Sequence, residues 1–151
     1  MKRITIYALL GLVFFLNTAS MCSSDDASSA TNQTNIINTA TSGTWRIILY
    51  VDSDVVETNK FTGYNFTFAQ NGTLSANGNG QSYSGTWSVT DTNSNDDSLN
   101  DLDFNIAFSS PADFFDLTDD WDIVSRTETK IVLFDISGGN GRTDNLTFEK
   151  N

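Results

Sequence analysis

Residues 83–90 read YSGTWSVT, and residues 102–108 read LDFNIAF. In both stretches large apolar side chains alternate with smaller or polar ones, so each stretch places its apolar residues on one face of an extended chain. The same period of two returns in Tyr64, Phe66 and Phe68. This alternation is typical of strands that bury one face against a core and leave the other face in water. The sequence therefore predicts an all-β domain.

Further short strands continue the pattern along the chain. The first strand is predicted over 45–51, with Trp45, Ile47, Leu49 and Val51 on one face. The remaining strands are predicted over 73–76, 121–126, 130–137 and 145–150, and Asn-Gly or Gly-rich turns join several of them. Residues 111–118 are predicted to form one short helix, because Pro111 breaks the alternation. About eight antiparallel strands predict an up-and-down barrel or a sandwich, and closure of a barrel removes exposed sheet edges.

The composition excludes several functions. The 151 residues include no His and one Cys. There are 19 acidic and 8 basic side chains, which gives a net charge of −11. Without His, the chain lacks the imidazole that Ser-His-Asp catalysis and many zinc sites require. An acidic surface repels the phosphates of nucleic acids. We therefore expect no enzymatic activity, no cofactor and no nucleic-acid partner, and we expect a monomer.

The N-terminus has the order of an export signal. Lys2 and Arg3 precede the apolar run Ile4–Leu16, and the small polar segment 17–20 follows. The run is shorter than the roughly 20 residues that cross a bilayer as a helix. We expect residues 1–21 to be a removable signal peptide.

The lone cysteine follows this signal. Residues 19–22 read ASMC, which resembles a bacterial lipobox, and this resemblance implies that Cys22 is lipidated and anchors the protein in a membrane. Cleavage after Ser20 by the ordinary signal peptidase is the alternative. The next residues resemble the acidic signal that directs Bacteroidota-type lipoproteins to the cell surface; they are Ser23, Ser24, Asp25 and Asp26. We expect the outer membrane as the location, with surface exposure or, alternatively, a periplasm-facing domain.

A polar segment separates this anchor from the domain. Residues 22–42 consist mainly of Ser, Thr, Asn, Ala and Asp, and Ile36 and Ile37 are their large aliphatic side chains. Such a composition predicts a disordered tether. Every aromatic residue after the signal lies between Trp45 and Phe148. The folded domain is therefore predicted over 43–150.

Several short motifs resemble a known family. The chain has Gly43-Thr44-Trp45, Asn71-Gly72-Thr73, Gly85-Thr86-Trp87 and, at 146–150, LTFEK. Together with the N-terminal signals, these motifs resemble a lipocalin-like domain lipoprotein of Bacteroidota type. The resemblance implies that Trp45 and Trp87 are structural residues at a barrel end. It also implies a late arginine packed on Trp45, for which Arg126 and Arg142 are the candidates.

The inward-facing residues allow two interpretations. An eight-stranded barrel is just wide enough to be filled by its own side chains or to hold one small ligand. In the first interpretation these residues form a plain core, and the module binds a protein partner through its acidic loops. In the second they line a pocket for a small apolar or amphipathic ligand, which the Tyr83 hydroxyl could orient. The residues concerned are Phe66, Phe68, Tyr83, Phe104, Phe108 and Leu133.

Acidic segments raise the question of a metal or catalytic site. Residues 91–97, with Asp101 and Asp103, offer oxygen ligands, but they lack the Gly and Glu positions of an EF-hand loop. We predict a solvated loop and no metal. Gly138–Gly141 is predicted to be a hairpin loop. A second acidic group is predicted to be exposed rather than catalytic; it comprises Asp113, Asp116, Asp119, Asp120 and Asp122.

Overall fold

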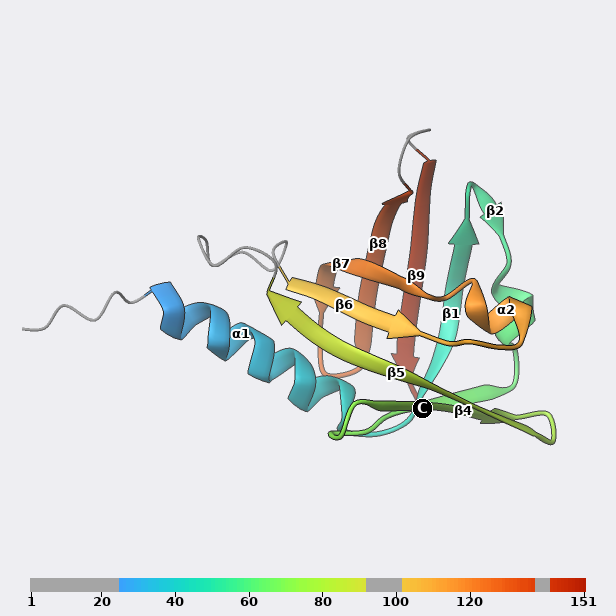
Figure 1. Cartoon of the computed structure of the whole chain (residues 1–151), viewed down its shortest axis with the longest axis horizontal. Coiled ribbons are helices and arrows are strands. Elements are labelled where there is room, and N and C mark those ends of the chain that lie inside the picture. Colours follow the sequence, from blue (N-terminus) through green and yellow to red (C-terminus); the bar gives the residue numbers. More distant parts are fainter. Residues whose placement is uncertain (1–24, 92–101, 138–141) are drawn as a thin grey trace, which may run out of the picture.

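The computed structural model describes residues 25–91, 102–137 and 142–151, and most of these residues lie in β-strands (Figure 1). The strands are β1 (Trp45–Asp52), β2 (Val55–Val56), β3 (Tyr64–Phe68), β4 (Thr73–Gly78), β5 (Gln81–Asp91), β6 (Leu102–Ala107), β7 (Asp119–Arg126), β8 (Lys130–Ser137) and β9 (Arg142–Lys150). The described helices are α1 (Asp25–Ala40), α2 (Ala112–Phe115) and the 3-10 helix η1 (Thr58–Phe61).

Pairing of the first and last strands closes the sheet. β1 pairs with β9 from Trp45 opposite Lys150 to Val51 opposite Asn145, and it also pairs with β3 where Trp45 lies opposite Phe66. The other strands pair antiparallel in sequence order, and β2 extends the sheet from β1. Eight strands therefore form a closed up-and-down barrel with a short helix at 112–115, which confirms the predicted fold class.

The predicted alternation decides which side chains fill the barrel. Phe68 is 1% exposed, and its ring lies 5.2 Å from Trp87, 5.4 Å from Phe104 and 5.3 Å from Phe148, measured between centroids. These separations are typical of aromatic rings in contact. The side chains of four strands thus meet in one shared core.

A β-bulge corrects the predicted face of the first strand. Between Ile47 and Leu49 the register with β9 shifts by one residue, so Ile48 is inserted into β1. Beyond the bulge, Tyr50 is buried and Leu49 is 38% exposed. The expectation that Leu49 and Val51 share the buried face of Trp45 was wrong, because an inserted residue reverses the side-chain alternation.

The residues of the turn explain the conformation of the β4–β5 hairpin. Asn79 and Gly80 have positive φ angles of 52° and 74°, the conformation that a tight two-residue hairpin turn requires. Gly78, just before the turn, has no room for a side chain, since a Cβ there would lie 2.1 Å from the carbonyl oxygen of Gly63. This glycine lets β3 and β4 approach each other closely.

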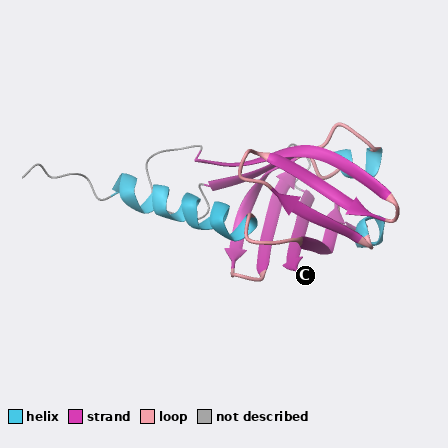
Figure 2. Cartoon of the chain, turned by 90° about the horizontal axis from the view of Figure 1, so that it is seen from below, coloured by secondary structure: helices cyan, strands magenta, loops and turns pink. Residues whose placement is uncertain are grey.

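Helix α1 covers one end of the barrel, which we call the closed end, where β1 begins and β9 ends. Ile36 and Ala40 are fully buried there, and Trp45 Nε1 donates to the Ala40 carbonyl at 2.8 Å. Gln33 Nε2 also donates to the Val89 carbonyl at 2.7 Å. The remainder of α1 extends away from the barrel (Figures 1 and 2).

This arrangement corrects the predicted tether. Residues 25–40, within the segment 22–42 expected to be disordered, form a helix instead. The composition concealed it, because Ser, Thr and Asn are poor helix formers and the segment has few apolar residues. Burial of Ile36 and Ala40 against the barrel supplies the stabilisation that the isolated segment lacks.

The opposite end, which we call the mouth, is filled by a side chain from α2. Phe114 is 2% exposed, and its ring centroid lies 4.6 Å from that of Tyr83, 5.4 Å from that of Phe61 and 5.3 Å from that of Phe108. Thr118 Oγ1 accepts from the Phe108 amide at 2.9 Å, which joins the two ends of the loop that carries α2. Phe114 therefore closes the aromatic core at the mouth.

Replacing this side chain tests its role. We expect Phe114→Ala to lower the free energy of unfolding by about 3–5 kcal/mol, because it leaves a cavity among aromatic rings. The matched control is Phe115→Ala, where the side chain is 57% exposed and the expected change is below about 1 kcal/mol. Urea denaturation of both variants measures the difference, and equal losses would contradict the role of Phe114.

Candidate functional site: an acidic barrel mouth

Carboxylates gather at the mouth of the barrel. They come from the ends of β1 and β8, from the starts of β7 and β9, from the residue before η1 and from the α2 segment. Lys60 of η1 lies among some of them. They form two groups, which we describe in turn; together the residues are Asp52, Glu57, Asp113, Asp116, Asp119, Asp135 and Asp144.

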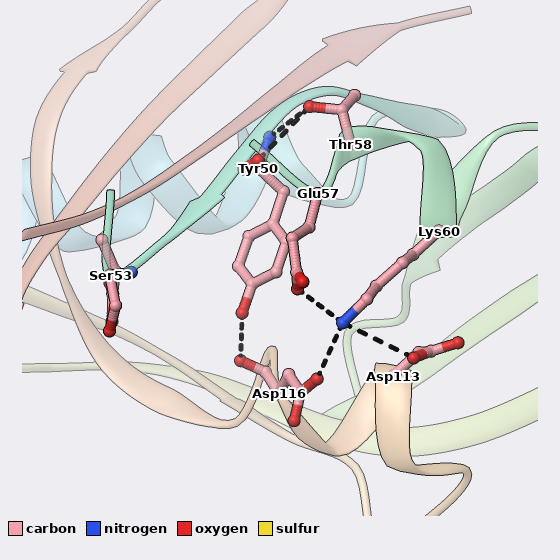
Figure 3. Close-up of polar contacts among 8 residues, drawn as sticks. Tyr50, Ser53, Glu57, Thr58, Lys60, Asp113 and Asp116 are labelled. Atoms are coloured by element: carbon pink, nitrogen blue, oxygen red, sulfur yellow. Dashed lines mark hydrogen bonds and ion pairs between the residues drawn. The ribbon is translucent and has the colours of Figure 1, made fainter. Parts of the chain in front are cut away.

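The first group surrounds Lys60 (Figure 3). The Lys60 ammonium nitrogen lies 2.5 Å from Glu57 Oε2, 3.3 Å from Asp116 Oδ2 and 3.6 Å from Asp113 Oδ1. The hydrogen bond to Glu57 and then that to Asp116 raise the pKa of Lys60 above its ordinary value. One lysine therefore joins η1 to α2 and offsets part of the negative charge.

Tyr50 links β1 to the same group. Its hydroxyl donates to the Asp116 carbonyl at 2.7 Å, and its backbone amide donates to Thr58 Oγ1 at 2.9 Å (Figure 3). Burial, followed by the nearby Asp52 carboxylate, raises the pKa of the Tyr50 phenol. Tyr50 stays neutral and positions α2 over the mouth.

The second group consists of Asp119, Asp135 and Asp144, which we call the carboxylate triad. Each residue offers an oxygen, and the three oxygens all lie within 4.8 Å of one another. Asp135 lies directly opposite Asp144 in the β8–β9 ladder. The Ser53 amide donates to Asp144 Oδ1 at 2.6 Å, and the Asp120 amide donates to Asp119 Oδ1 at 2.9 Å.

The alternation of the strands places the triad. Ile131 and Leu133 of β8 point into the barrel, so Asp135 is the next residue of that face. On β9, Phe148 and Leu146 are buried, and Asp144 is the next residue of their face towards the mouth. The period that builds the core thus carries carboxylates into its mouth, and this signal was present in the sequence.

Burial and neighbouring negative charges raise the pKa values of two carboxyl groups of the triad. Burial is the largest cause that raises the pKa of Asp119, to about 6, and the negative charges of Asp135 and Asp120 contribute. Burial and then Asp144 raise the pKa of Asp135. Oxygens at this spacing could share one hard divalent cation or surround the cationic group of a lysine or arginine.

The structure separates the predicted acidic residues. Asp113 and Asp116 lie beside Lys60, and Asp119 belongs to the triad. Asp120 and Asp122 lie on the outward face of β7, where they alternate with the buried Trp121 and Ile123. Sequence reasoning missed the other members of the mouth because they lie in two regions of the chain, each far in sequence from the predicted acidic group or from the other region; they are Asp52, Glu57, Asp135 and Asp144.

The six residues predicted to line a pocket lie in the aromatic and aliphatic interior. Phe66, Phe68, Phe104, Phe108 and Leu133 are at most 2% exposed. Tyr83 is half-buried, 5.8 Å from Tyr64 and beside Phe114 at the mouth. They belong to one hydrophobic core, in which Phe68 contacts Phe104, and Tyr83 and Phe108 contact Phe114.

The predicted barrel-end tryptophans lie towards the closed end. Trp87 Nε1 donates to the Ala69 carbonyl of the β3–β4 turn at 2.9 Å. The cation over the Trp45 ring is Lys150, whose Nζ lies 5.9 Å from the ring centroid. The expectation of Arg126 or Arg142 in that place was wrong. Arg126 donates to Thr39 Oγ1 of α1, and Arg142 begins β9 at the mouth.

Several predicted features lie outside the described residues. These are the signal peptide, Cys22, Ser23 and Ser24, most of the acidic loop after Asp91, and Gly138–Gly141. Asp25 and Asp26 begin α1, and Asp103 is buried in β6. Among the described helices, none combines the length and the apolar character needed to span a bilayer.

A different surface lies outside β5 and β6. Two adjoining grooves of about 550 Å³ each run across these strands, and Thr86, Ala107 and Thr118 line both. Ser84 and Ser88 line one groove each. We call this outward side of β5 and β6 the hydroxyl face. Asp119 also borders one groove, whereas Asp135 and Asp144 do not.

The raised pKa of Asp119 predicts a pH dependence. The folded chain holds a proton on Asp119 that the unfolded chain loses above its ordinary pKa, so the free energy of unfolding falls as pH rises from about 4 to about 6. We expect Asp119→Asn to raise the free energy of unfolding by about 1 kcal/mol at pH 7, allowing for solvent screening of a partly exposed group, and to change it little at pH 4. Urea denaturation at both pH values measures this. The control Glu128→Gln, in an exposed turn, is expected to show no such pH dependence, and an equal effect of Asp119→Asn at both pH values would contradict the assignment.

The chain was compared with protein families, curated proteins and solved structures. No family model and no curated protein matches the sequence. Among solved structures, the chain is similar to a DUF4847 family protein from Bacteroides vulgatus ATCC 8482. The TM-score is 0.49 and 16% of residues are identical, over 77% of this chain and 97% of that one.

Proposed function

We propose that this protein is a non-enzymatic, lipid-anchored module of the bacterial outer membrane, displayed at the cell surface, that binds a cationic protein segment at its acidic mouth. The observation that carries the binding proposal is the carboxylate triad, whose three oxygens lie within 4.8 Å of one another; burial, and then the neighbouring carboxylates, raise the pKa of Asp119 to about 6. A bound cation would relieve this repulsion. The N-terminal signals and Cys22 support the anchor.

The mouth contains its own example of such recognition. Lys60 lies among three carboxylates of the first group, at distances of 2.5–3.6 Å. A lysine or arginine of a partner would take the corresponding place among Asp119, Asp135 and Asp144. Charge-assisted hydrogen bonds of this kind are stronger than neutral ones. Several such contacts on one basic segment would add to each other.

Two other functions receive less support. A ligand inside the barrel would need the space that Phe68, Phe104 and Phe114 occupy. An acid–base hydrolase would need one groove that brings its substrate to two carboxylates. The groove beside Asp119 is not lined by Asp135 or Asp144. The proposal therefore assigns the mouth to binding.

A basic peptide tests the binding proposal. We expect a decalysine peptide to bind the full-length protein in isothermal titration calorimetry at about 20 mM salt and to bind much more weakly at about 300 mM. Asp135→Asn with Asp144→Asn should weaken binding about tenfold or more, because the amides keep the shape but lose the charge. Binding should also strengthen from pH 5 to pH 7, as Asp119 ionises.

The control is Glu128→Gln, which removes one acidic charge from the β7–β8 turn at the closed end. It should change the affinity less than about twofold. Equal weakening by Glu128→Gln and by the double variant would show that net charge alone attracts the peptide. That result, or no binding at low salt, would contradict the proposed site.

A separate experiment tests the anchor. In a bacterial host that processes lipoproteins, Cys22→Ala should move the protein from the membrane fraction to the soluble fraction, because the acylated thiol is lost. Ser24→Ala keeps the thiol and should leave the protein in the membrane fraction. Unchanged fractionation of Cys22→Ala would refute lipidation. Protease treatment of intact cells then separates surface display from a periplasm-facing domain.

A further inference from the structure

One side of the barrel exterior is apolar, although it faces outward. The outward residues of β7, β8, β1 and β2 include Val56, Val124 and Ile136, which are 66%, 56% and 58% exposed. Leu49 is 38% exposed. Together with three partly exposed neighbours they form what we call the apolar face, which consists of Leu49, Val51, Val56, Val124, Val132, Phe134 and Ile136.

Strand register places these residues in two outward rows, in which a polar residue of β9 lies between the apolar residues of β8 and β1. Phe134, Asn145, Val51 and Val56 lie directly opposite one another across β8, β9, β1 and β2. Val132, Thr147 and Leu49 form the next outward row. Neighbouring strands of a sheet lie about 4.8 Å apart, so each residue of a row is the direct neighbour of the next one along that row.

Barrel construction does not require this surface. On the hydroxyl face, Ser84, Thr86 and Ser88 occupy the outward positions of β5, as expected of a sheet that faces water. Several large apolar side chains exposed on one side of a protein are typical of a place of contact. The β-bulge in β1 extends the surface, since it turns Leu49 outward, and Val124 points outward by the ordinary alternation of β7.

We propose that a second copy of this chain covers the apolar face in a two-fold symmetric dimer, in place of the expected monomer. The two sheets would pack face to face, with strands of one copy antiparallel to those of the other. Aliphatic side chains on a sheet are suited to such packing. A two-fold interface must be complementary to itself, and the charges at the edges of the face meet this condition.

The two edges of the face carry different charges. At the closed end, Arg46 and Lys130 are 54% and 45% exposed and share Glu149 as their ion-pair partner. On the β7 side of the face, Asp122 points outward beside Phe134, and Asp120 points outward nearer the mouth. A two-fold axis that runs across the strands brings the closed-end edge of one copy to the mouth edge of the other. Lys130 then approaches Asp122 of the second copy.

The direction of α1 is compatible with this arrangement. In Figure 1 the direction of α1 is transverse to that of β8, β9 and β1, and α1 extends to one side of these strands. A two-fold axis across the same strands leaves both α1 helices pointing in one direction. Both N-termini could then reach one membrane, if the protein is anchored as proposed. A bilayer is the less suitable occupant of the face itself, because Asp120 and Asp122 border it and anionic head groups repel them.

The molar mass of the full-length protein in mild detergent tests the proposal. In sedimentation velocity, we expect the wild-type chain to be a dimer. Leu49→Lys with Ile136→Lys should yield a monomer, since the cations would be buried without partners. The matched control, Thr86→Lys with Ser88→Lys on the hydroxyl face, should remain a dimer. Circular dichroism and the thermal midpoint check that each variant is folded.

A charge exchange tests the antiparallel arrangement. Lys130→Glu should weaken the dimer, and adding Asp122→Lys should restore it, because the pair is re-formed with reversed signs. A monomeric wild-type chain, or a dimer unaffected by the Leu49 and Ile136 substitutions, would overturn the proposal. A monomer that binds anionic phospholipid vesicles through this face would also overturn it. Failure of the charge exchange alone would overturn the antiparallel arrangement.

Discussion

The pairing of β1 with β9 is the constraint on which the rest of the structure depends. It closes eight strands into a ring, so every inward side chain must share one interior and every outward side chain must face solvent or a partner. Phe68, Phe104 and Phe148 come from three different strands and meet in that interior. Closure also leaves two ends, and the chain covers each with a different helix. Apolar α1 residues cover the closed end, and Phe114 of α2 covers the mouth.

The mouth shows how the same construction produces a charged site. Aspartates at the ends of β8 and β9 occupy inward positions, where closure of the barrel brings their carboxylates together. Burial, and then the charges of the neighbouring carboxylates, act on the same groups, which is the reason for the raised pKa of Asp119. The proposed site for a cationic segment rests on geometry and charge together, whereas the hydrophobic core accounts for the stability of the fold.

The outside of the barrel has two faces of different polarity. The hydroxyl face of β5 and β6 interacts well with water, whereas the apolar face on β8, β9 and β1 does not. The mouth and the apolar face are adjacent but use different physical interactions. Long-range charge attraction would act at the mouth, and short-range packing would act on the apolar face. The two proposals can therefore be tested separately.

The sequence by itself determined the strands and their buried faces wherever the period of two is unbroken, as in Tyr64–Phe68 and Leu102–Phe108, because alternation reflects burial directly. It also determined the Asn79-Gly80 turn, whose residues tolerate positive φ. Only the tertiary structure decided three features: the outward direction of Leu49, the helical conformation of residues 25–40, and the proximity of Asp119 to Asp135 and Asp144. Each of these depends on contacts between segments far apart in the chain, and no local pattern of residues specifies which distant segment will supply them.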